Sequence, residues 1–128
     1  MANSDPIAYV FTAVNGYSSF GSFVGNGLAN GPFIYCGFKP KFFMMKKQDI
    51  AGTNFIIYDT ERGDVPGHNP LDNILHPDGT YIEGSGKKLD FVSNGVKIRD
   101  TNAGINGENH IFVYAAFAEL PFKTARAV

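Results

Sequence analysis

The chain has 128 residues, a length that fits one domain, and its formal net charge of −1 argues against a basic nucleic-acid-binding surface. Its 15 glycines and 7 prolines exclude helical bundles and doubly wound α/β folds, because inside a helix they cost about 1 and 3 kcal/mol relative to alanine. No apolar run approaches the roughly 18 residues of a membrane span, and aromatic-rich runs broken by Gly, Asn and Asp predict an all-β domain.

Strands are predicted along the first half of the chain. Residues 7–14 and 17–24 are apolar runs on either side of Asn15-Gly16, a pair typical of a two-residue hairpin turn because both turn residues need a positive φ. That hairpin would place Phe11 opposite Phe20. Three further strands are expected at residues 33–38, 41–48 and 53–60.

A long connection follows these strands. Residues 61–80 contain Pro66, Pro70 and Pro77 among polar residues, and this composition predicts a loop without regular structure. A loop of some 20 residues is unusual in a compact domain and is often functional. A short strand is expected at residues 81–83.

Residues 89–99 predict a hairpin with apolar side chains on one face and charged side chains on the other. A two-residue turn at Asn94-Gly95 would place Phe91 opposite Ile98. The same turn would place Asp90 opposite Arg99, as a cross-strand pair of opposite charges.

The end of the chain predicts one more strand. Residues 100–109 have the composition of a loop, and residues 111–118 are a continuous apolar run expected to be a central strand buried on both faces. The alanines in this run leave a helix as the rival interpretation, but its β-branched and aromatic residues favour a strand.

Together these elements predict a single antiparallel β-sandwich of about eight strands, jelly-roll-like in topology, over residues 1–128. Tyr9-Val10-Phe11 resembles the apolar run at 113–117. We therefore expect residues 7–24 to be the closing strand region of a preceding repeat in a longer chain. The alternative is that two apolar strands resemble each other by chance.

The sequence contains no recognisable catalytic or metal-binding pattern. Asp64, His68, Asp72 and His76 follow one another at spacings of four, but the intervening prolines exclude a regular helix that would place them on one face. No serine has the sequence of a nucleophile elbow, and the carboxylates of this region are interpreted as solvated loop residues. We expect a non-enzymatic protein with no metal and no cofactor.

Other reactive or charged residues have structural interpretations. Cys36, the one cysteine, is expected to be a small buried hydrophobe. Lys39, Lys41, Lys46 and Lys47 surround a predicted apolar strand and are interpreted as solubilising gatekeepers. A single-stranded nucleic-acid site is the alternative, which the near-neutral charge disfavours, so no nucleic-acid partner and no membrane insertion are expected.

Four segments resemble, in order and spacing, segments of the tail proteins of tailed bacteriophages. They are residues 14–27, 31–40, 90–99 and 114–123. The resemblance implies a tail-fibre or other virion structural domain near the C-terminus of a longer polypeptide. It also implies a protein made in the bacterial host cytoplasm, located on the virion, and assembled as a homotrimer.

The function that this resemblance implies is recognition of the host surface. Loops on a β scaffold would make shallow polar contacts with a host polysaccharide or protein receptor, strengthened by multivalency. The candidate receptor contacts lie in the long loop: Arg62, Asp64, His68, Asn69, Asp72 and Asn73. One alternative is a purely structural trimerisation, assembly or capsid-decorating module, in which this loop packs against a neighbouring subunit. The other is a fragment of a polysaccharide depolymerase.

Overall fold

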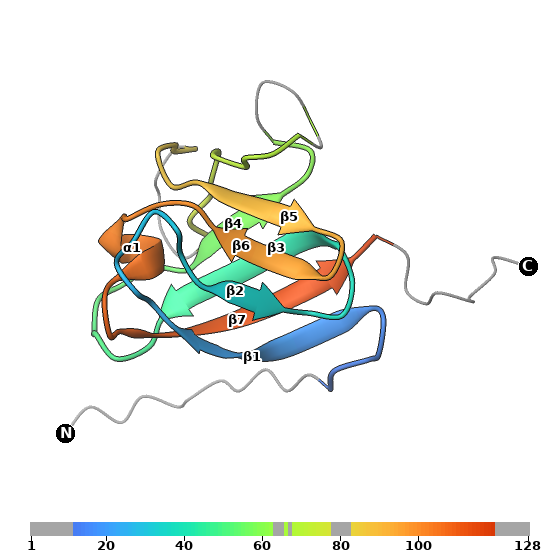
Figure 1. The fold of residues 1–128 in the computed structure, drawn as a ribbon, viewed down its shortest axis with the longest axis horizontal. Helices are drawn as coiled ribbons and strands as arrows, with labels where there is room; N and C mark the ends of the chain where they lie inside the picture. The colour runs from blue at the N-terminus through green and yellow to red at the C-terminus, as the bar shows by residue number, and fades with distance from the viewer. Residues whose placement is uncertain (1–11, 63–65, 67, 78–82, 120–128) are drawn as a thin grey trace, which may run out of the picture.

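The computed structural model describes residues 12–62, 66, 68–77 and 83–119. Within these residues, short strands and one helical turn follow one another along the chain (Figure 1). They are β1 (Ser18–Val24), β2 (Phe33–Tyr35), β3 (Pro40–Lys47), β4 (Ile56–Asp59), β5 (Leu89–Val92), β6 (Gly95–Ile98), α1 (Ala103–Asn106) and β7 (Ile111–Ala118).

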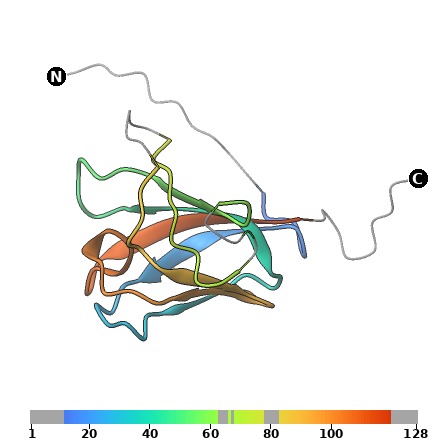
Figure 2. The ribbon, with the colours of Figure 1, turned by 90° about the horizontal axis from the view of Figure 1, so that it is seen from above.

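The strands form two antiparallel sheets that pack face to face. The four-stranded sheet has the order β1-β7-β3-β4, and the three-stranded sheet has the order β2-β6-β5. Figure 2 shows the two sheets as two layers. Their inward side chains form one core, in which the rings of Phe43 on β3 and Phe91 on β5 meet with centroids 6.5 Å apart. The predicted all-β sandwich is confirmed.

The jelly-roll part of the prediction is not confirmed. In a jelly roll, a long hairpin folds over on itself, so the first strand pairs with the last and the second with the last but one. The pairs β1·β7 and β2·β6 follow this order. The inner strands differ, because β3 pairs with β4 and β5 pairs with β6 as local hairpins. The described residues hold seven strands and not the eight expected.

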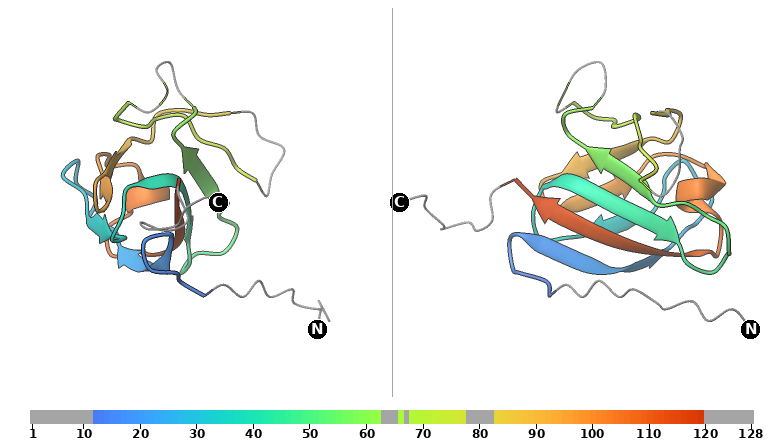
Figure 3. Two further views of the ribbon diagram at one scale, coloured as in Figure 1. Left: turned by 90° about the vertical axis from the view of Figure 1, so that its right-hand side faces the viewer. Right: turned by 180° about the vertical axis from the view of Figure 1, so that it is seen from behind.

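Strand β7 is central, as predicted, with β1 on one side and β3 on the other. The helix alternative is therefore excluded. Burial on both faces was a wrong expectation, because the three-stranded sheet covers only one side of β7. Phe112 and Ala116 point into the core, whereas Val113, Ala115 and Phe117 on the opposite face are half-buried. Figure 3 shows this outer side of the four-stranded sheet from behind.

The β5–β6 hairpin forms with a register different from the predicted one. Val92 pairs with Gly95, so the turn residues are Ser93 and Asn94. A Cβ on Gly95 would lie 2.0 Å from the carbonyl oxygen of Ile34. Glycine is therefore required for the close approach of β2, and not for the turn. Arg99 still pairs with Asp90, with Nε 2.7 Å from Oδ2.

The N-terminal hairpin is only partly as predicted. A turn forms, with Gly16 at φ +78° and the Tyr17 N–H donating to Val14 O at 2.9 Å. The Val14 N–H donates to the hydroxyl of Ser18 at 2.8 Å, and residues 12–14 form no strand. Strand β1 pairs with β7 instead. Phe11, and with it the Phe11–Phe20 pairing, lies outside the described residues, as do residues 7–10 of the proposed closing strand region. Residues 12–24 of that region are described, and β1 within them is the edge strand of this domain's own four-stranded sheet.

Two smaller elements also differ from expectation. The loop at 100–109 contains α1, whose first turn is capped by Asn102: its Oδ1 accepts from the Gly104 N–H at 2.7 Å. The strand expected at 81–83 lies largely outside the described residues, and Gly84 beside it forms an isolated bridge with Ile74.

Candidate functional site

The long connection between β4 and β5 closes one side of the sandwich. Leu71 pairs with Leu89 at the edge of β5, and Leu75 pairs with Ile57 at the edge of β4. The connection therefore covers the outer edges of both sheets, and Figure 1 shows it above β4 and β5. Edge strands with unpaired N–H and C=O groups invite association with other chains, and this connection protects two of them.

Two of the predicted receptor contacts hold this connection in place. The side-chain amide of Asn69 donates to Phe91 O at 2.8 Å and accepts from the Phe91 N–H at 3.0 Å, as a neighbouring strand would. The carboxylate of Asp72 accepts from the N–H groups of Gly86 and Lys87. Both side chains therefore serve the fold.

Arg62 and Asn73 meet at Glu83. Arg62 Nη1 lies 2.7 Å from one carboxylate oxygen of Glu83, and Asn73 Nδ2 donates to the other at 3.2 Å. Arg62 Nε also lies 2.7 Å from Asp59 Oδ2. The hydrogen bond to Glu83 and the charge of Asp59 raise the pKa of the Arg62 guanidinium. Arg62 thus fastens the start of the connection to its far end.

The six candidate contacts do not form one cluster. Arg62 and Asn73 are brought together at Glu83. Asn69 bonds to β5, Asp72 bonds to residues 86 and 87 of the connection itself, and His68 is exposed. Asp64 lies outside the described residues. Their role as receptor contacts stays a prediction.

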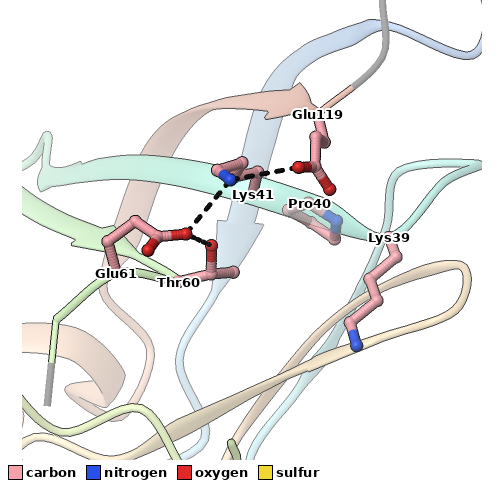
Figure 4. A pocket seen from close by; sticks show the side chains of 6 residues that line it. All are labelled: Lys39, Pro40, Lys41, Thr60, Glu61 and Glu119. Atoms are coloured by element: carbon pink, nitrogen blue, oxygen red, sulfur yellow. Dashed lines mark hydrogen bonds and ion pairs between the residues drawn. The ribbon is translucent and has the colours of Figure 1, made fainter. Parts of the chain in front are cut away.

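A shallow pocket, the edge pocket, opens where β3 begins and β4 ends (Figure 4). Its volume is about 340 Å³. Lys41 lies at its centre, with Nζ 3.1 Å from Glu61 and 3.2 Å from Glu119. The hydrogen bonds to these two carboxylates raise the pKa of Lys41. Because the cation already has two anionic partners, this pocket has little charge to offer a ligand.

A second pocket of about 190 Å³, the basic pocket, lies at the other end of β3. It is lined by Lys47, Gly52, Thr53, Asn54, Ile56, His76, Lys87 and Gly104. Lys47 is only 8% exposed, and its Nζ lies 5.8 Å from the centroid of the Phe112 ring. No other described residue is recorded as a hydrogen-bond or ion-pair partner of this ammonium group.

Lys47 was wrongly grouped with the surface lysines in the sequence interpretation. The signal that identifies it is the period of two in β3, where Phe43, Met45 and Lys47 all face the core. Lys46, the next residue along the strand, points to the outer face and lies 4.9 Å from the centroid of the Phe55 ring. The remaining lining residues come from distant parts of the chain, and no sequence pattern links them.

The described part of the chain contains no group of three or more His, Cys, Asp or Glu side chains that would hold a metal ion. No helix among these residues has the length and apolar character needed to cross a membrane.

A family model described as "Domain of unknown function (DUF7483)" matches residues 1–121. No curated protein and no solved structure matches the chain.

Proposed function

We propose that this chain, which belongs to the DUF7483 family, is a non-enzymatic binding domain of a bacteriophage tail fibre or related virion appendage. In this proposal it contacts polysaccharide on the host surface. Many weak contacts on one particle act together, which raises the apparent affinity by about 10²–10⁴ over a single contact.

The observation that supports this proposal best is the way the 61–88 connection is held. Among its described residues, Asn69 bonds to Phe91 on β5, and Asp72 ties two parts of the connection to each other, so His68, next to Asn69, is presented from a fixed position. A binding surface that is ordered before it meets its ligand loses less conformational entropy on binding. Residues that recognise ligands are commonly carried on loops positioned by a rigid scaffold.

The test is binding of the full chain to a panel of bacterial cells and purified surface polysaccharides. We expect saturable binding to some members of the panel, and reduced binding after His68→Ala or Asn73→Ala. Arg99→Ala, in the second hairpin, is the matched control and should bind as the unmodified protein does. A folded protein that binds none of the cells or polysaccharides contradicts the proposal. Release of oligosaccharide during incubation would support the depolymerase alternative.

A second candidate function, an assembly module, is favoured by the outer face of the four-stranded sheet. This outer face carries half-buried apolar side chains: Phe42, Met44, Ile57, Val113, Ala115 and Phe117. Apolar side chains gathered on one face of a domain are a common mark of a protein–protein contact. We propose a second copy of this chain as its partner, in keeping with the homotrimer that the phage resemblance implies.

A further inference from the structure

We propose that the basic pocket is a binding site for an oxyanion, either a carboxylate or a phosphate group. That this group belongs to an acidic polysaccharide is a further step that rests on the proposed function. Binding of the oxyanion itself does not depend on that step.

The first argument is the position of Lys47. A buried charge is costly unless it is paired and hydrogen-bonded. Lys47 is only 8% exposed, and among the described residues Phe112 is the one partner of its ammonium group. At 5.8 Å the ring is near the limit of about 6 Å for a cation–π contact, and a ring face does not satisfy three N–H donors. An oxyanion in the pocket would supply both the charge and the acceptors.

The second argument is the composition of the pocket wall. Lys87 and His76 line the same pocket, and the described lining includes no aspartate or glutamate. The stem of Lys87 lies against Gly104, where an added Cβ would be 3.2 Å from Lys87 Cε. Two lysines therefore border one small space whose described wall carries no carboxylate.

The third argument is that the backbone around the pocket is held in place. The Thr53 hydroxyl donates to Lys47 O at 2.9 Å, which fixes the β3–β4 turn to the end of β3. The Lys87 N–H donates to Asp72 at 3.0 Å. The two cations thus come from anchored backbone positions, as an electrostatic site requires.

The edge pocket provides an internal comparison. There, Lys41 is neutralised by Glu61 and Glu119, whereas the part of the basic pocket's lining that the structure describes has two lysines and no carboxylate. The volume of the basic pocket, about 190 Å³, is below the roughly 300 Å³ at which pockets for drug-sized ligands begin. The fitting occupant is one charged substituent and not a whole oligosaccharide.

The experiment is an NMR titration of the ¹⁵N-labelled full chain with inorganic phosphate, glucuronate and, as the uncharged control, glucose. Phosphate or glucuronate should shift the amide signals of residues 52–54 and of Gly104 in a saturable way, and glucose should not. The better of the two anions indicates which group the pocket prefers. If neither anion shifts these amides, the proposal is wrong.

Two pairs of variants make the test specific. Lys47→Gln and Lys87→Gln should each weaken anion binding about tenfold or more, the effect of losing a charged hydrogen bond. The neighbouring Lys46→Gln and Lys88→Gln change the net charge equally and should leave binding unaltered. Because Lys47→Gln alters a buried position, Lys87→Gln decides the matter if the first variant does not fold. If all four variants weaken anion binding equally, the anion responds only to the overall charge of the protein, and the proposed site is wrong.

The same variants separate this inference from the proposed function. Phosphate or glucuronate binding by a protein that binds no host polysaccharide would keep the oxyanion site and reject the proposed function. Undiminished polysaccharide binding by Lys87→Gln would reject the pocket as the place where an acidic polysaccharide is held.

Discussion

Asn106 connects three parts of the chain from a fully buried position. Its Oδ1 accepts from the Asn26 N–H at 2.8 Å, and its Nδ2, which has two N–H donors, lies 2.8 Å from Leu28 O, 2.9 Å from Asp100 O and 3.1 Å from Asn26 Oδ1. These bonds fasten α1 to the loop between β1 and β2. A buried side chain that meets most of its hydrogen-bonding capacity supports a unique packing, and its removal leaves buried partners unsatisfied.

We therefore expect Asn106→Ala to lower the free energy of unfolding by about 3 kcal/mol, because several buried partners lose their hydrogen bonds together. Urea denaturation measures this change. Asn30→Ala, an exposed asparagine in the β1–β2 loop, is the control and should change stability by less than about 0.5 kcal/mol. Similar values for the two variants would contradict the structural role of Asn106.

Cys36 is a buried thiol, as expected from the sequence, and burial raises its pKa to about 11. Since the thiolate is the reactive form, iodoacetamide should label the folded protein far more slowly at pH 8 than the denatured protein. Labelling at the same rate in both states would contradict the burial of this side chain.

The same shift predicts how stability depends on pH. The unfolded thiol loses its proton near its ordinary pKa of 9.0, whereas the folded thiol keeps it until about pH 11. Because the folded state binds more protons over this interval, the free energy of unfolding should fall as the pH rises through it. Cys36→Ala should remove this part of the decline in denaturation measured from pH 8 to 11. An unchanged slope in the variant would show that other groups cause it.

At the scale of elements, the connection between β4 and β5 behaves as part of the sandwich. Asn69→Ala should free it from β5, with a stability loss of about 1–3 kcal/mol from the unsatisfied backbone of Phe91. Amide hydrogen exchange should then accelerate at Leu71 and Phe91. His68→Ala changes the exposed neighbouring side chain and should leave exchange unaltered. If both variants exchange alike, Asn69 does not hold the connection.

The elements also show where sequence patterns succeed. The period of two in residues 89–92 and 95–98 identified the inward residues of β5 and β6, because local alternation reports burial directly. It did not identify their register. Gly95 was assigned to the turn, since a glycine after asparagine is a local signal, whereas its actual reason is the approach of β2. Contacts with distant strands leave no such local mark.

In the candidate site, too, local sequence patterns were informative and contacts between distant segments were not predicted. The prolines identify the long loop, but the predicted receptor contacts include Asn69 and Asp72, which bind backbone 14 to 22 residues away. The basic pocket was missed because its walls come from β3, the β3–β4 turn, β4, the long connection and α1. Only the fold brings these segments together, so a sequence without the structure does not predict the site.

At the scale of the whole molecule, the two sides of the four-stranded sheet differ in how they are covered. One side meets the three-stranded sheet in the core, and the outer face presents half-buried apolar side chains around Met44, Ala115 and Ile57, which lie in register on three strands. The net charge of −1 gives little repulsion between copies of the chain. Association through the outer face would remove this apolar surface from water.

We expect the unmodified protein to sediment as an oligomer, with a trimer as the predicted state, and Met44→Glu to sediment as a monomer that retains its β-sheet circular dichroism. The charge would lie in the middle of the outer face, where association would desolvate it without a partner. Tyr35→Glu is the matched control, because Tyr35 is 68% exposed on β2 in the other sheet and should leave the oligomer intact. Sedimentation of the unmodified protein as a monomer at all concentrations would exclude the outer face as an interface between copies. An intact Met44→Glu oligomer would place the interface elsewhere.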